Sequence, residues 1–313
     1  MPSVINEASK KSYKALLLLI AFMNSLYRTT LNQLRLQLFL RRRQVIQILS
    51  DKYFTSKQKE WQIFVVITHI VKSEEAKNAE VGSQKIERLC QTIDGLLSSF
   101  SHHDLKIVIN TLPDRNIVSF LPPYVREKIF VREAEVEDPM ILGHYAQELM
   151  VENKDDFDWF LFIEDDIVIR DSCFLEKIEF FNAYSQTQSI LIPNRYEMYN
   201  GVKHYIDINF DSGEKPMLEW NRLSTLNIGG IKFSECQNPH GGMYCLNKNQ
   251  LQKWINSGRY WQNKNVSIGP LESAATFCLF ECFNLYKPYS SNLHFLEVLH
   301  YDVKYSKVGH SLQ

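Results

Sequence analysis

The 313-residue sequence predicts an α/β fold with a mostly parallel central sheet flanked by helices. Two observations lead to this prediction. Short apolar runs, rich in β-branched and aromatic residues, alternate with stretches of helical periodicity between residues 61 and 169, which is typical of parallel βαβ units. The composition, 45% hydrophobic and 23% charged, is that of an ordinary folded protein that is long enough to bury a core.

The expected strands of the first half are apolar runs that end in polar or turn-forming residues. They are WQIFVVITHIV (61–71), LKIVIN (105–110), EKIFVRE (127–133) and WFLFIEDDIVI (159–169). Between them, a polar, helix-favouring stretch runs from Glu74 to about Phe100, and its apolar positions between residues 86 and 97 fit one helix face. A second helix is predicted over residues 138–153. Asp138 and Pro139 suit the N-cap and the first position of the second helix.

After residue 169 the predicted strands and helices no longer alternate regularly. We expect strands at ILIPN (190–194), HYIDINF (204–210, part of a hairpin), HGGMYCL (240–246) and FLEVLHYDV (295–303, a closing strand or loop). Helices are expected over LNKNQLQKWINS (246–257) and GPLESAATFCLFECFNL (269–285). One α/β domain, residues 59–313, preceded by a basic helical extension, residues 1–58, is the simplest organisation.

The net charge of −1 conceals a basic N-terminal segment. Residues 1–60 hold 11 Lys and Arg against 3 Asp and Glu, while the remaining residues hold 24 against 33. Such a segment suits an anionic partner, and because it contains no recognised nucleic-acid motif, we expect a membrane surface rather than nucleic acid. Residues 10–48 are either an interfacial amphipathic helix or a helix packed on its own domain.

Cysteine usage and hydropathy bear on location. The six cysteines show no metal-binding or CxxC spacing, which favours free thiols in a reducing compartment. The apolar run ALLLLIAFM (15–23) is shorter than the roughly 20 residues that cross a bilayer. We therefore expect a cytoplasmic protein whose basic extension touches the inner membrane face, where anionic lipids attract Lys and Arg.

The most informative stretch is WFLFIEDD, in which Glu164, Asp165 and Asp166 end an apolar strand. Burying an unpaired carboxylate is costly. Ligands of open α/β sheets lie beyond the carboxyl ends of the strands, which is where these side chains emerge. A divalent cation with hard oxygen ligands, Mg²⁺ or Mn²⁺, would neutralise them and could also hold a substrate diphosphate.

The stretch FLFIEDDIVI resembles the DxD-type motif of glycosyltransferases with the GT-A fold, in particular the EDD form of the N-acetylglucosaminyltransferase type. The resemblance covers residues 61–303 in element order, with sequence matches confined to short motifs. It implies a nucleotide-sugar donor, expected to be a UDP-sugar, with Mn²⁺ or Mg²⁺ and a saccharide or lipid-linked acceptor. In the family pattern the last acid, here Asp166, contacts the metal, and Glu164 and Asp165 contact the sugar or ribose.

Two downstream positions take further roles in this resemblance. His300, after an apolar run near the C-terminus, would complete the metal site, in competition with His294 and His310. Glu272, two residues after Pro270 at a helix start, would be the base that deprotonates the acceptor in an inverting reaction; the other interpretation is a glutamate that only stabilises the helix start.

Five further residues are candidates for binding the donor. Gly241 and Gly242 would let the backbone approach the donor sugar, although an ordinary turn explains two glycines equally well. Thr68 and His69, at the end of the first strand, and Arg115, after the second, would face the nucleotide. Asn194 and Arg195 would face the same cleft, although a surface arginine is the simpler interpretation.

Two other functions remain alternatives. A nucleotidyltransferase shares a related sheet and a metal, but it normally has a basic, glycine-rich loop after the first strand. Here that place contains THIVKSEEAKNAEVGS, with one glycine and several acids, which disfavours this class. The other alternative is a non-catalytic, membrane-associated binding or scaffold protein in which the three acids are merely solvated.

Overall fold

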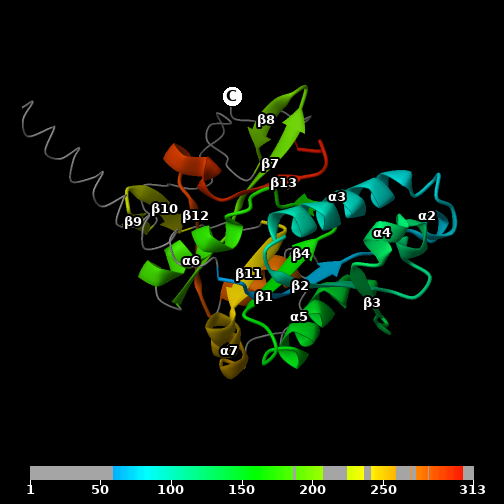
Figure 1. Ribbon diagram of the computed structural model, residues 1–313, viewed down its shortest axis with the longest axis horizontal. Coiled ribbons are helices and arrows are strands. Elements are labelled where there is room, and N and C mark those ends of the chain that lie inside the picture. Colours follow the sequence, from blue (N-terminus) through cyan, green and yellow to red (C-terminus); the bar gives the residue numbers. More distant parts are fainter. Residues whose placement is uncertain are drawn as a thin grey trace, which may run out of the picture. The chain divides into compact units, whose positions relative to one another are not determined.

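The structure, a computed structural model, describes residues 59–185, 188–206, 224–235, 241–258, 269, 273–280 and 282–305. The basic extension, with its expected amphipathic helix at 10–48, lies outside the described residues, so the division at residues 58 and 59 stays a prediction. The predicted α/β fold is confirmed: a mostly parallel central sheet is flanked by helices, and two smaller sheets follow it (Figure 1).

The central sheet has five strands in the order β11-β4-β1-β2-β3. Its strands are β1 (Gln62–Thr68), β2 (Asp104–Thr111), β3 (Ile129–Glu133), β4 (Trp159–Glu164) and β11 (Met243–Asn247). The first four strands run parallel, and β11 runs antiparallel to β4. The parallel register pairs Thr68 with both Asn110 and Glu164, so three strands end at one edge of the sheet.

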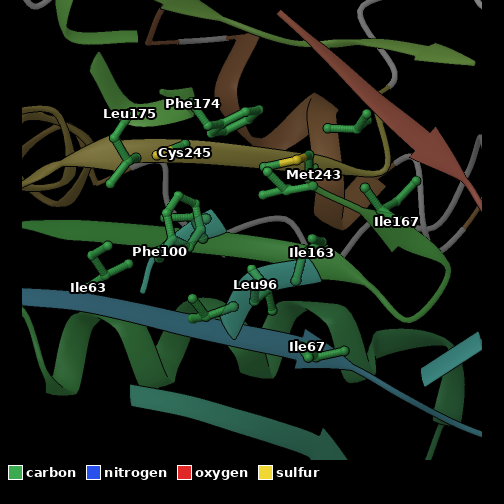
Figure 2. Packing of buried hydrophobic residues seen from close by; sticks show 14 of the residues in the cluster. Ile63, Ile67, Leu96, Phe100, Ile163, Ile167, Phe174, Leu175, Met243 and Cys245 are labelled. Atoms are coloured by element: carbon green, nitrogen blue, oxygen red, sulfur yellow. The ribbon is translucent and has the colours of Figure 1, made fainter. Parts of the chain in front are cut away.

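Helices cover both faces of this sheet (Figure 1), because strands β1 and β4 carry apolar side chains on both faces. Odd-numbered residues of β1 and β4, such as Ile67 and Ile163, pack with α3 (Ser83–Ser99). Even-numbered residues, such as Phe162, pack with α5 (Leu142–Glu152). Figure 2 shows the α3 side of the core, where Leu96 faces the isoleucines of the sheet.

The helices bear out most of the expected positions. The helix-favouring stretch from Glu74 to about Phe100 is divided into the short α2 (Ser73–Lys77) and α3, with residues 78–82 between them outside any helix. The start of the 138–153 helix is a 3₁₀ turn (Pro139–Ile141), and the Asp138 side chain caps it by accepting a hydrogen bond of 2.9 Å from the Met140 amide. The remaining helical segments are η1 (Val118–Phe120), α4 (Pro123–Arg126), α6 (Phe174–Ser185), α7 (Lys248–Asn256), α9 (Cys278–Phe280) and η6 (Ser290–Phe295).

Two four-stranded sheets form the second half. One has the order β6-β12-β10-β9, with β6 (Ser189–Leu191), β12 (Asn284–Pro288), β10 (Ile231–Glu235) and β9 (Thr225–Ile228). The other has the order β5-β13-β7-β8, with β5 (Ile167–Val168), β13 (Glu297–His300), β7 (Asn194–Tyr199) and β8 (Val202–Tyr205). The strand expected at 204–210 as part of a hairpin overlaps only the last two residues of β8, which forms a hairpin with β7; residues 207–210 lie outside the described residues.

Three expectations need correction. The single strand expected at 159–169 breaks at a turn, and its second part, β5, joins a different sheet. The helix expected at 269–285 ends early: a π-helical turn (Ser273–Phe277) and α9 are followed by β12, because Leu285 and Tyr286 are buried against β6 and β10. Strands β7, β9 and β10 were not expected. Among the described residues, no helix combines the length and apolarity that a membrane span needs.

Candidate active site

The three acids lie where β4 leaves the central sheet. Glu164 is the last residue of β4, Asp165 and Asp166 form the turn, and β5 begins at Ile167. Because β13 runs antiparallel to β5 with His300 opposite Ile167, the imidazole comes to lie beside Asp166. The Tyr301 amide fixes this arrangement by donating a hydrogen bond of 2.7 Å to the Asp166 carbonyl.

Asp166, His300 and Glu197 form a buried chain of charged groups. The His300 Nε2 lies 3.5 Å from Asp166 Oδ2, and its Nδ1 lies 2.9 Å from Glu197 Oε1. The Glu197 side chain is fully buried on β7 and also accepts a hydrogen bond of 3.3 Å from the Tyr305 amide. Glu197 therefore orients the imidazole so that Nε2 points towards Asp166.

Arg88 reaches the same carboxylate from α3. Its Nη2 donates to Asp166 Oδ2 in a short contact, and its Nη1 lies 3.8 Å from Asp302 Oδ2. α3 follows β1 and runs back along the parallel sheet, so its first turns lie at the edge where the acids emerge. The Arg88 side chain is only 11% exposed.

The other two acids have separate environments. Asp165 Oδ2 lies 2.6 Å from His69 Nδ1, and Thr92 of α3 donates to the Asp165 carbonyl at 3.1 Å. Glu164 lies beside Gly242: the Glu164 amide donates to the Gly242 carbonyl at 2.9 Å. Gly242 has φ +63°, and a Cβ there would lie 3.2 Å from Glu164 Oε2, so a glycine lets this chain approach the carboxylate.

Burial and neighbouring charges shift the pKa values of these groups in opposite directions. Burial, reinforced by the charge of Asp166, raises the pKa of Glu164 to about 8. Burial alone would raise the pKa of Asp166, but the hydrogen bond and charge of His300, together with Arg88, lower it to about 2. Burial opposes the protonated form of His300, yet its bonds to Asp166 and Glu197 raise its pKa to about 9. Asp166 and His300 are therefore an ion pair near neutral pH.

Five buried polar atoms gather at this edge without a hydrogen-bond partner. They are Thr68 Oγ1, His69 Nε2, Arg88 Nε, Glu164 Oε1 and Asp166 Oδ1. Buried polar groups in folded proteins are nearly always hydrogen-bonded, so such a concentration is unusual. It is the pattern expected of a site that completes its hydrogen bonds with a polar ligand.

The structure thus brings together seven of the residues singled out in the sequence: Thr68, His69, Glu164, Asp165, Asp166, Gly242 and His300. Gly241 faces elsewhere, because a Cβ on it would lie 2.6 Å from the Ile192 side chain. Arg115 Nε donates to the Val71 carbonyl at 2.7 Å and so braces the loop after β1. Glu272 and His310 lie outside the described residues.

Sequence reasoning did not find Arg88, Glu197 or Asp302. Arg88 is one of several charged residues on α3, and its position in the sequence does not distinguish it from a solvated surface residue. Glu197 belongs to the segment RYEMY, and a single acid among aromatic and apolar residues was the available signal. Arg195, on the same strand, is buried, and its positive charge acts on Glu164 and Asp166.

A separate hollow lies between α3 and residues 168–172. It has a volume of about 470 Å³ and is lined by polar side chains of α3, among them Gln91 and Asp94, and by Arg170 and Ser172 beyond β5. None of the three acids lines it. Within the described part of the chain, no group of three or more His, Cys, Asp or Glu side chains is arranged to hold a metal ion, so Asp166 and His300 remain a candidate pair.

Comparison with known proteins gives weak structural matches only, with TM-scores of 0.37, 0.42 and 0.32. No protein-family model and no curated protein matches the sequence. Among solved structures, A197 from STIV matches with 14% identity and a TM-score of 0.37, over 73% of this chain and 82% of that one. S. aureus TarS, residues 1–349, matches with 9% identity and a TM-score of 0.42, over 73% of this chain and 58% of the TarS chain. An active-site mutant of LgtC matches with 10% identity and a TM-score of 0.32, over 67% and 69%.

Proposed function

We propose that the protein is a metal-dependent glycosyltransferase of the GT-A type, which transfers a hexosyl or N-acetylhexosaminyl group from a nucleotide-diphosphate sugar to a saccharide or lipid-linked acceptor. The single observation that carries the proposal is the group of five unpartnered polar atoms around the acids at the carboxyl edge of the sheet. Hydroxyl, imidazole, guanidinium and carboxylate groups together match a ligand with both anionic and hydroxyl-bearing parts, as a nucleotide sugar has.

The residues present fit a hard divalent cation, Mn²⁺ or Mg²⁺. Asp166 offers the unpartnered Oδ1, and His300 presents Nε2 towards the same carboxylate, while Glu197 orients the ring from its other side. An imidazole binds a metal in its neutral form, so His300 Nε2 would have to lose its proton when a cation binds. Two protein ligands suit a cation that takes its remaining ligands from water and a diphosphate. When bound, such a cation would neutralise the charge that develops on the departing nucleoside diphosphate.

The other side chains would bind and position the two substrates. Thr68 and His69, at the end of β1, would bind the nucleotide, and His69 would keep Asp165 in place through their 2.6 Å contact. Glu164, beside Gly242, would hold a sugar hydroxyl; its raised pKa favours the neutral form, which can donate as well as accept a hydrogen bond. Glu272 remains the proposed base of an inverting reaction, and Arg115 a proposed nucleotide contact.

The acceptor and the location also remain proposals. A lipid-linked or growing saccharide acceptor would suit a protein whose residues 10–48 touch the inner membrane face, with Lys and Arg attracted to anionic lipids.

Calorimetry with UDP in the presence and absence of Mn²⁺, followed by hydrolysis of a panel of nucleotide sugars, tests the function. The wild-type protein should bind UDP only with the metal. Asp166→Asn should lose the binding of UDP that Mn²⁺ promotes, because the carboxylate that holds the cation is gone. Its turnover should fall by about two orders of magnitude or more.

Asp156→Asn is the matched control, since this exposed aspartate precedes the amino end of β4 at the opposite edge of the sheet. It should behave like the wild type. Full turnover of Asp166→Asn with added Mn²⁺ would remove the metal assignment. Absence of nucleotide binding under any condition would favour the scaffold alternative, and release of pyrophosphate from a nucleoside triphosphate would favour a nucleotidyltransferase.

A further inference from the structure

Arg88 occupies a position that the proposed function does not yet explain. Its guanidinium lies between two carboxylates, in contact with Asp166 and 3.8 Å from Asp302. The side chain is 11% exposed, and its Nε is buried without a hydrogen-bond partner. An arginine offers five N–H donors, so a buried guanidinium with an unused donor has room for a further anionic oxygen.

The contact with Asp166 conflicts with the binding of a cation. Arg88 bonds to Asp166 Oδ2, the same oxygen that lies 3.5 Å from His300 Nε2. A divalent cation bound between Asp166 and His300 would therefore meet the positive charge of Arg88 at close range. The repulsion falls if the guanidinium turns from the carboxylate towards an anion nearby, and the neighbouring Asp302 gives it a second anchor at this edge of α3.

We infer that Arg88 is a ligand of the donor diphosphate. Before the cation and the nucleotide bind together, Arg88 forms an ion pair with Asp166. This inference rests on the proposed function. The planar guanidinium fork matches two oxygens of a phosphate, and its Nε and Nη groups are the donors that such a contact uses. In the absence of nucleotide, Arg88 supplies the positive charge that Asp166 needs, so the ligand-free site resists a cation on its own.

The consequence is a positive coupling between the two ligands. A cation alone has to displace Arg88 from Asp166, whereas a cation that arrives with a diphosphate gives the guanidinium a new partner. Each ligand therefore raises the affinity of the protein for the other, and thermodynamic linkage requires the two effects to be equal. Removing the guanidinium should change the two affinities in opposite directions, which loss of a merely structural arginine would not do.

The test is calorimetry on the full-length protein with Mn²⁺ alone and with UDP at saturating Mn²⁺. Arg88→Gln should bind Mn²⁺ alone about 5-fold more tightly or better, because the competing charge is gone. It should bind UDP about 10- to 100-fold more weakly, because a charge-assisted contact is lost. Arg88→Lys keeps the charge without the fork, so its affinity for Mn²⁺ should match the wild type while UDP binding is still weakened.

Arg126→Gln is the control, because it removes the same charge from an exposed position at the end of α4, and it should alter neither affinity. Arg88→Gln is first shown to fold by an unfolding midpoint that matches the wild type. The inference is then overturned if this variant leaves the affinity for Mn²⁺ or for UDP unchanged, or if it binds Mn²⁺ more weakly. If the wild type binds Mn²⁺ and UDP and responds to Asp166→Asn but not to Arg88→Gln, this inference alone fails. If the wild type binds neither ligand, the proposed function fails with it.

Discussion

The buried carboxyl of Glu164 makes the stability of the fold depend on pH in a direction opposite to that of most carboxylates. Burial raises its pKa from 4.5 to about 8 in the folded state. A group whose pKa is raised on folding contributes its full stability below pH 4.5 and loses it as the pH rises through about 8. The protonated form is neutral, and Glu164→Gln mimics it at every pH.

The magnitude follows from the two pKa values. The gap between 4.5 and about 8 corresponds to roughly 5 kcal/mol at about 1.4 kcal/mol per pKa unit. Relaxation around the ionised carboxylate reduces this value, so about 3–5 kcal/mol is expected. The free energy of unfolding of Glu164→Gln minus that of the wild type should therefore rise by about 3–5 kcal/mol between pH 5 and pH 9.

Denaturant unfolding at pH 5, 7 and 9 in the presence of EDTA measures the effect, because the chelator prevents a cation from stabilising the ionised carboxylate. Groups far from Glu164 titrate alike in both proteins and cancel in the difference. The charge of His300 acts on Glu164, so its titration contributes to the measured difference. Glu152→Gln, at the exposed end of α5, is the matched control and should show a constant difference. A constant difference for Glu164→Gln as well would refute the argument that burial controls this carboxyl.

Two further predictions concern the site's geometry. Gly242→Ala should destabilise the fold by about 1–3 kcal/mol, because its φ is +63° and the new methyl would meet the Ile167 side chain at 2.8 Å. Gly201→Ala, with φ +77° and nothing within 4 Å, is its matched control and should cost only the backbone strain; equal costs in denaturant unfolding would contradict the packing argument. Glu197→Gln should weaken Mn²⁺ binding about 10- to 100-fold by calorimetry, since Glu197 orients His300; unchanged affinity would refute this.

Much of the first half could be predicted because local and tertiary preferences agree there. WFLFIEDD combines a strand that is apolar on both faces with acids that no core tolerates unpaired, so both the strand and its functional end can be inferred from the sequence. The same stretch also misled the prediction. Ile167 and Val168 continue the apolar pattern after the acids, and the pattern carries no sign that they pair with β13 in another sheet.

The parts that could not be predicted depend on contacts between residues far apart in the chain. Leu285 and Tyr286 continue a helical pattern, yet pairing with β6 and β10 makes this segment a strand. The glycine pair shows a subtler limit: only the structure tells that Gly242 approaches Glu164 while Gly241 packs against Ile192. The partners of Asp166 raise the same difficulty, because Arg88 comes from α3.

The turn at Asp165 and Asp166 is also the covalent joint between the central sheet and the sheet that contains β13. One side of the site is therefore carried by β1 and β4, and the other by β13 and β7. If the two sheets slide against each other, Asp166 and His300 move together, because β5 and β13 belong to the same sheet. The spacing that changes is the one between His300 and the residues at the end of β1, Thr68 and His69. A ligand that contacts both sides would hold the two sheets in one relative position.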